Sequence, residues 1–181
     1  LKVQWGNKLK LYNTLSGENE EFQSREDGVV KIFVCGPTVY DSAHLGHART
    51  YLVYDVLVRY LKMKGFVTIF IVNITDLDDK VFEKAEMEGI NFEDLAERYT
   101  QEFITSLERF RINSINAFHK ASNYLNEIEY QIDHLIKNGH AYQVDGDIFF
   151  DVSSFPDYGL LSNQTPCELM LRRLNPDPKK R

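Results

Sequence analysis

The residues best suited to chemistry lie in one stretch, residues 35–50, which reads CGPTVYDSAHLGHART. It holds a thiol, two imidazoles three residues apart and two glycines, namely Cys35, His44, His47, Gly36 and Gly46. Glycine lets the backbone approach a ligand closely, and an imidazole can donate a hydrogen bond to a phosphate oxygen. Nucleotidyl transfer needs such donors more than it needs covalent help from the protein. We therefore predict that this stretch binds a nucleoside triphosphate.

The elements around this stretch predict where it lies in the fold. Apolar β-branched residues from Lys31 to Cys35 predict a buried strand, and helical spacing predicts a helix from Gly46 to Lys64. A second apolar run, Phe66 to Ile74, predicts a central strand. Strand, helix and strand form a right-handed crossover, whose ligands bind at the carboxyl ends of the strands. Unsatisfied N–H groups at the helix start would favour anionic oxygens there.

The rest of the chain continues the mixed α/β pattern. Amphipathic spacing and turn residues predict helices, a short strand and a hairpin that turns at Asp145-Gly146. The predicted helices are Asp79 to Glu88, Phe92 to Phe110 and Asn123 to Lys137; the predicted strands are Ser114 to Phe118, Ala141 to Val144 and Ile148 to Val152. We place a soft boundary near Ala121, where the crossover pattern gives way to a helix and a hairpin.

Each candidate residue also has a purely structural interpretation. Most isolated histidines cap or pack a helix, and a lone cysteine at a strand end is usually a small buried hydrophobe. Asn73 could simply end its strand. The acidic residues Asp76, Asp78 and Asp79 could hold a metal, but we favour helix N-capping and solvated charge because carboxylates are preferred at a helix start.

Three motifs in order resemble a known family. His44-Leu-Gly-His47 resembles the HIGH signature of class I aminoacyl-tRNA synthetases. The flanking CGPTVYD and HART, followed by NITDLDDK at residues 73–80, resemble cysteinyl-tRNA synthetases in particular. The resemblance begins at Leu9, covers nearly the whole chain and fades at its basic end. It implies an α/β fold, the first half of a Rossmann-like parallel nucleotide-binding sheet in residues 1–121, followed by the start of an inserted α+β domain in residues 122–181.

The resemblance also implies a reaction and a set of site residues. Cysteine carboxylate would attack the α-phosphorus of ATP, with Mg²⁺, to give cysteinyl-adenylate, and the acyl group would pass to tRNA(Cys). His44 and His47 match the catalytic positions, and Cys35 matches a zinc ligand that would bind the substrate thiolate; Zn²⁺ prefers sulfur to a hydroxyl. Residues matching the adenylate site are Gly36, Pro37, Thr38, His44, Gly46 and His47. Residues matching the L-cysteine site are Cys35, Gly36, Thr38, Thr50, Asn73, Ile74 and Thr75.

The sequence departs from the family pattern in what it lacks. It contains no KMSKS-like loop, since Lys62-Met-Lys64 lies in the predicted helix, and the other zinc ligands are also missing. We therefore expect an N-terminal fragment that binds zinc poorly and does not complete aminoacylation alone. Two alternatives stay open: an ATP-dependent cysteine ligase that acylates an amino sugar in mycothiol synthesis, and a non-catalytic nucleotide-binding module.

Composition limits the other possibilities. The net charge of −6 argues weakly against a general nucleic-acid binder, because such proteins usually carry a basic face. No apolar run approaches the length of about 18 residues that a membrane-spanning helix needs, so we expect no membrane partner. Two cysteines, Cys35 and Cys167, without a visible export signal favour a reducing compartment, and we expect a cytoplasmic protein.

Overall fold

The computed structural model describes residues 9–164. Cys167 and the basic residues after it lie outside the described residues. The chain divides into two compact units, one comprising Gln23–Leu125 and the other Leu1–Phe22 with Asn126–Arg181. The assignment of residues 1–121 and 122–181 to a catalytic and an inserted domain stays a prediction.

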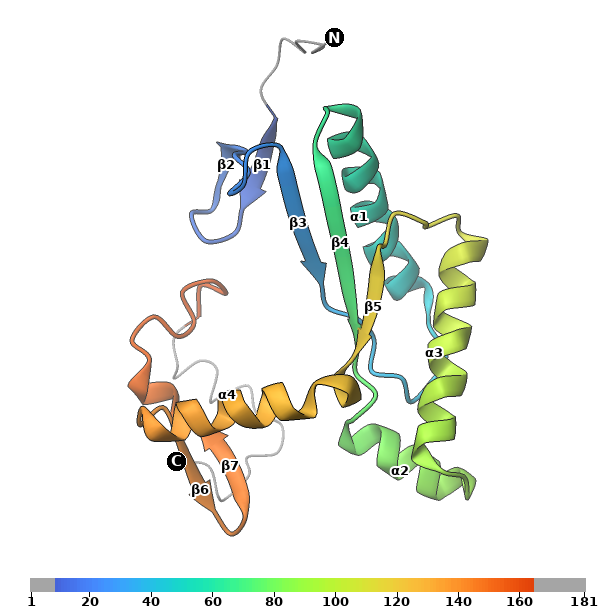
Figure 1. Ribbon diagram of the computed structural model, residues 1–181, viewed down its shortest axis with the longest axis vertical. Helices are drawn as coiled ribbons and strands as arrows, with labels where there is room; N and C mark the ends of the chain where they lie inside the picture. The colour runs from blue at the N-terminus through green and yellow to red at the C-terminus, as the bar shows by residue number, and fades with distance from the viewer. Residues whose placement is uncertain (1–8, 165–181) are drawn as a thin grey trace. The chain divides into compact units, whose positions relative to one another are not determined.

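A three-stranded parallel sheet organises the first unit. Its strands are β3 (Val29–Val34), β4 (Val67–Ile74) and β5 (Ala117–Lys120), in that spatial order, and Figure 1 shows the three arrows side by side pointing the same way. Val34 pairs with Val72, and Ile74 with Lys120. The predicted α/β fold with a Rossmann-like parallel sheet is confirmed.

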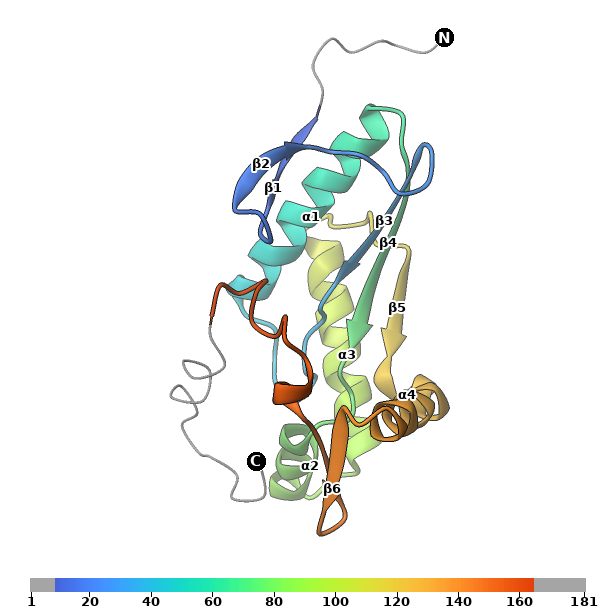
Figure 2. The same cartoon turned by 90° about the vertical axis from the view of Figure 1, so that its left-hand side faces the viewer.

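Helices connect the strands and bury one face of the sheet. α1 (Leu45–Met63) runs back alongside β4 and also contacts α3 (Phe92–Arg109), which packs against α2 (Asp79–Glu88) (Figure 2). The core between them contains the fully buried Tyr51 and Val58 of α1, Phe70 and Ile74 of β4, and Leu95 of α3. These residues lie at helical spacing or at alternate strand positions, as burial of one face requires.

The second unit holds two hairpins and a helix. β1 (Lys10–Asn13) pairs with β2 (Glu18–Glu21), and β6 (Ala141–Val144) pairs with β7 (Asp147–Phe150). Its helix is α4 (Leu125–Lys137), which follows the 3₁₀ turn η1 (Ala121–Tyr124) of the first unit, and η2 (Val152–Ser154) follows β7. The predicted turn at Asp145-Gly146 is confirmed, with φ of 52° and 90° at the two residues. Two positive φ angles define the type I′ turn that matches strand twist.

One predicted strand lies further along the chain than expected. Strand β5 begins at Ala117 rather than Ser114, because the amides of residues 113 and 114 donate to the buried Asp55 carboxylate at 3.2 and 2.9 Å. The Asn116 side chain accepts from Phe70 N–H at 2.7 Å. The amides of residues 113 and 114 and the N–H of Phe70 are thus bound by side chains and do not take part in the ladder.

The structure also corrects the prediction that Asp76, Asp78 and Asp79 serve as helix caps and solvated charges. Asp78 does cap α2, accepting from Lys80 N–H at 3.0 Å. Asp76 is not solvated: it is 6% exposed and accepts from both the backbone N–H and the hydroxyl of Ser122. Its carboxylate therefore binds Ser122 of η1, the 3₁₀ turn that precedes α4.

Candidate active site

His44 and His47 together cap the N-terminus of α1. His44 is the N-cap residue, with an extended backbone (φ −103°, ψ 172°), and its Nδ1 accepts from Gly46 N–H at 3.0 Å. His47 reaches back, and its Nδ1 accepts from His44 N–H at 3.2 Å. The two rings lie against each other with centroids 4.1 Å apart. This reciprocal arrangement is a capping box in which two imidazoles replace the usual hydroxyl and carboxylate.

The capping bonds fix where each ring carries its proton. A nitrogen that accepts from a backbone N–H has no hydrogen of its own, so each neutral imidazole keeps its hydrogen on Nε2. Both rings therefore present an Nε2–H donor. Burial lowers the pKa of His47, and the charge of the neighbouring His44 lowers it further. His47 is thus held as a neutral donor at neutral pH.

The same bonds correct one expectation about anion binding. The N–H groups of Gly46 and His47 are not free, because the first donates to His44 Nδ1 and the second to the His44 carbonyl at 2.9 Å. The donors that His44 and His47 offer to an anion at this helix end are therefore the Nε2–H groups of their rings. The structural alternative for the histidines, helix capping, is therefore real, and it leaves the outer nitrogen of each ring available.

Cys35 lies directly after β3 with its side chain exposed. Its thiol donates to the Gly36 carbonyl at 3.6 Å. The peptide that joins Cys35 to Gly36 is bound at both polar atoms: the Tyr51 hydroxyl donates to the Cys35 carbonyl at 2.8 Å, and Gly36 N–H donates to Asn73 Oδ1 at 2.7 Å. Convergence of the thiol and the two imidazoles on one pocket stays a prediction.

Gly36 is required by the close approach of two backbones. A Cβ at this position would lie 1.4 Å from the carbonyl oxygen of Asn73, a distance at which no side chain fits. Beyond the glycine, Thr75 N–H donates to the Pro37 carbonyl at 3.0 Å, and Thr38 pairs with Thr75 in a parallel bridge. Pro37, Thr38 and Thr75 thus continue the sheet at its carboxyl edge.

The other predicted contacts occupy different environments. Thr50 is exposed on α1, and its hydroxyl donates to the Gly46 carbonyl at 3.1 Å. Asn73 is half-buried, and its amide also donates to the Thr75 hydroxyl at 3.3 Å. Ile74 is fully buried in the core, which leaves only its backbone for a ligand. The substrate contacts assigned to these residues stay predictions.

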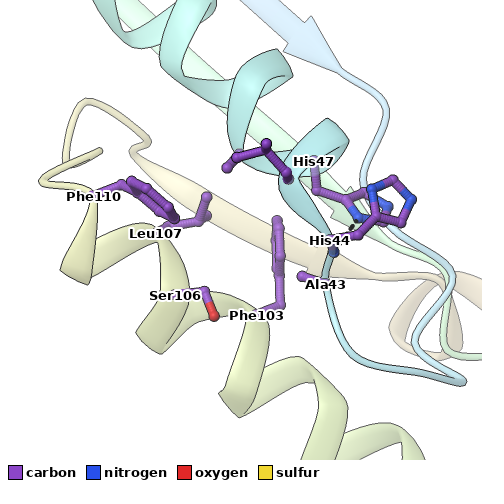
Figure 3. Close-up of a pocket in the computed structure, with 9 residues that line it drawn as sticks. Ala43, His44, His47, Phe103, Ser106, Leu107 and Phe110 are labelled. Carbon is purple, nitrogen blue, oxygen red and sulfur yellow. Dashed lines mark hydrogen bonds between the residues drawn. The ribbon is translucent and has the colours of Figure 1, made fainter.

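A cavity of about 190 Å³ lies between the start of α1 and α3. Its lining is mainly apolar: Ala43, His44, Leu45, His47, Ala48, Phe103, Ser106, Leu107 and Phe110. Figure 3 shows Phe103 and Leu107 on α3 facing α1, whereas both imidazoles are directed away from them. The apolar side of this cavity offers no charge that could hold a triphosphate.

Within residues 9–164, no three His, Cys, Asp or Glu side chains lie close enough together to hold a metal ion. Cys35 supplies one thiolate of the four ligands that a protein zinc site normally has. The described residues by themselves therefore do not fit zinc. The remaining histidines make local bonds, as expected for surface or packing residues: His119 to Tyr124, His134 to the Tyr130 carbonyl, and His140 to Ser154.

Two polar residues near the site were not singled out from the sequence. Tyr51 fits the helical spacing that predicts the helix from Gly46 to Lys64, and its position four residues after His47 places both on one helix face. Asp76 was assigned to solvent. No local pattern predicts its burial, because its partner Ser122 lies 46 residues away.

Comparison with known proteins shows the family to which the chain belongs. Residues 21–181 match the family described as tRNA synthetases class I (C) catalytic domain. The chain belongs to this family. Proteins named cysteine–tRNA ligase are similar over most of the chain: that of Thermoplasma acidophilum is 42% identical over 87% of this chain and 35% of its own length. Those of Caldicellulosiruptor saccharolyticus and Pyrococcus furiosus are also 42% identical, over 95% and 85% of this chain and 37% and 32% of their own.

The chain thus spans about a third of the length of the curated relatives it matches. Among solved structures, methionyl-tRNA synthetase of Mycobacterium tuberculosis in complex with methionyl-adenylate superposes with a TM-score of 0.55 at 20% identity, over 63% of this chain and 22% of that one. This likeness shows a shared fold. In the part of the chain that the structure describes, none of the helices has the length and apolar character needed to cross a membrane.

Proposed function

We propose that the protein is a cysteine–tRNA ligase, in which this chain forms the first half of the catalytic domain. It would activate L-cysteine with ATP and Mg²⁺ to cysteinyl-adenylate and transfer the acyl group to tRNA(Cys) in the cytoplasm. The observation that carries the proposal is the pair of Nε2–H donors at the start of α1, in a chain that matches the class I (C) catalytic domain over residues 21–181.

The chemistry follows from the capped geometry. When the cysteine carboxylate attacks the α-phosphorus, negative charge develops on the phosphorus oxygens, and pyrophosphate leaves. Two imidazoles whose Nδ1 atoms are held by the helix can each donate Nε2–H to that charge without reorganising. Cys35 and Asn73, at the carboxyl ends of β3 and β4, would line the amino-acid side of the site. We also propose that Cys35 is one ligand of a zinc ion whose other ligands lie outside residues 9–164.

Cysteine-dependent exchange of pyrophosphate into ATP by the full-length protein tests the first step. We expect exchange with cysteine and not with serine, and none from residues 1–181 alone. His44→Asn separates capping from catalysis, because Asn is a good N-cap residue but lacks the Nε2–H donor. We expect this variant to melt near the parent temperature and to lose about 100-fold or more in exchange rate.

His134→Asn is the matched control, since His134 bonds only within its own helix and should leave the rate unchanged. Exchange by His44→Asn at the parent rate would refute the role of the ring. Absence of exchange in the parent protein would favour a non-catalytic module. Exchange without charging of tRNA(Cys), but with acylation of an amino sugar, would favour the amino-sugar ligase.

A further inference from the structure

The peptide between Cys35 and Gly36 is held from two elements at once. Its carbonyl accepts from the Tyr51 hydroxyl of α1 at 2.8 Å, and its N–H donates to Asn73 Oδ1 of β4 at 2.7 Å. Rotation of the peptide plane would break both bonds. The orientation of the Cys35–Gly36 peptide is therefore held by these two side chains.

Tyr51 is itself rigidly placed. Its side chain is 1% exposed, and its ring packs edge-on against Phe103 of α3, with centroids 5.2 Å apart. Burial raises the pKa of Tyr51 far above its usual value, and the nearby Cys35 thiol raises it further. The hydroxyl thus stays protonated and remains a donor. The bond is partly buried, and loss of the hydroxyl would leave the Cys35 carbonyl without this partner.

Tyr51 also belongs to the helix that carries the imidazoles. His44, His47 and Tyr51 follow one another at intervals of three and four residues, which places them along one face of α1. One hydrogen bond from this face reaches the residue that carries the thiol. The backbone of Cys35 is thereby linked to α1 directly, and not only through residues 36–43.

We propose that Tyr51 is a positioning residue for cysteine activation. Its hydroxyl holds the backbone of Cys35 in place relative to the helix that carries His44 and His47. The inference rests on the proposed function, since it assigns Cys35 to the amino-acid side of the site. Tyr51 does not touch the substrate in this proposal; it acts through the Cys35 carbonyl.

Tyr51→Phe in the full-length protein tests the proposal, because it removes one hydroxyl and keeps the ring. We expect the KM for cysteine in pyrophosphate exchange to rise about tenfold, as loss of one buried hydrogen bond implies. The KM for ATP should stay within about twofold, because the caps of His44 and His47 do not involve Tyr51. Tyr54→Phe is the matched control: Tyr54 lies on the same helix, is half-buried and packs against Phe70, and we expect neither KM to change.

An unchanged KM for cysteine, or equal rises for cysteine and ATP, would overturn the positioning role. Should Tyr51→Phe fail to fold, Phe103→Leu keeps the hydroxyl but removes the ring behind it. A selective rise in the KM for cysteine is again expected, and no selective rise would overturn the role. If the parent protein shows no cysteine-dependent exchange, the proposed function fails instead, so the two failures are distinguishable.

Discussion

At His44 and His47, helix capping and the proposed catalysis use different nitrogens of the same rings. Nδ1 of each ring accepts from the backbone, and Nε2 carries the hydrogen. Residue type and spacing predicted the pair, and capping and catalysis looked like competing interpretations. They are compatible because the extended backbone of His44 turns its Nδ1 toward Gly46. This orientation of the His44 ring depends on backbone angles, which cannot be read from the sequence.

The lowered pKa of His47 predicts a pH-dependent stability. Since the unfolded chain binds this proton more readily than the folded chain, the free energy of unfolding is fully retained above about pH 6.5 and falls as the pH is lowered through the folded pKa. Urea unfolding of the chain at pH 7.5, 6.5 and 5.5 measures the loss. Hydrogen bonds from Arg98 and Lys120 lower the pKa values of Glu88 and Glu97 below the ordinary glutamate range, so these carboxylates do not titrate in this window.

His47→Gln provides the comparison for this pH series. Glutamine at the third helical position can still complete a capping box, but it does not titrate. We expect the variant to lose less stability than the parent between pH 7.5 and 5.5. Equal losses in the two proteins would show that His47 is not the titrating group.

At the scale of elements, the site depends on how β3 ends against β4. Apolar runs predicted both strands to within two residues, because buried parallel strands need continuous apolar side chains. The hairpin of β1 and β2 was not predicted: β2 reads Glu-Asn-Glu-Glu and is exposed throughout, so no alternation of polar and apolar residues marks it. The hydrogen bond from Gly36 N–H to Asn73 Oδ1 could not be predicted either, because it joins residues 37 positions apart in the sequence.

Gly36→Ala tests the close approach of these two strands. The new methyl group would overlap the Asn73 carbonyl oxygen, so the strand ends must separate, and we expect a loss of more than about 4 kcal/mol in the free energy of unfolding. Gly65→Ala is the control: Gly65 has a φ of +92° and no atom within 4 Å of its Cβ position, so only backbone strain of about 1–2 kcal/mol applies. Chemical denaturation measures both, and similar losses would contradict the steric explanation.

At the scale of the whole molecule, one face of the parallel sheet is apolar and exposed. Phe33, Val67 and Ile69 are 68%, 62% and 37% exposed, and they alternate along β3 and β4 with the buried Val34, Thr68 and Phe70. Contiguous apolar surface of this kind usually meets another part of a protein.

We therefore expect residues 1–181 alone to bind a hydrophobic fluorescent dye. The double variant Phe33→Ser with Ile69→Thr should bind less dye, because it removes apolar surface from the exposed face without touching the core. Met87→Ser, at an 83% exposed position on α2, should leave the signal unchanged. If the double variant retains the parent fluorescence, the dye binds elsewhere and the sheet face is not the accessible apolar surface.

The order of strands in the sheet, β3, β4, β5, is also their order along the chain. Each parallel strand is therefore added at the free edge of the strand made before it, and none has to be inserted between two others. During synthesis by the ribosome, the sheet can grow one crossover at a time as the nascent chain emerges. The third of these strands ends at Lys120, so the thiol and both imidazoles are already translated well before all three strands have been made.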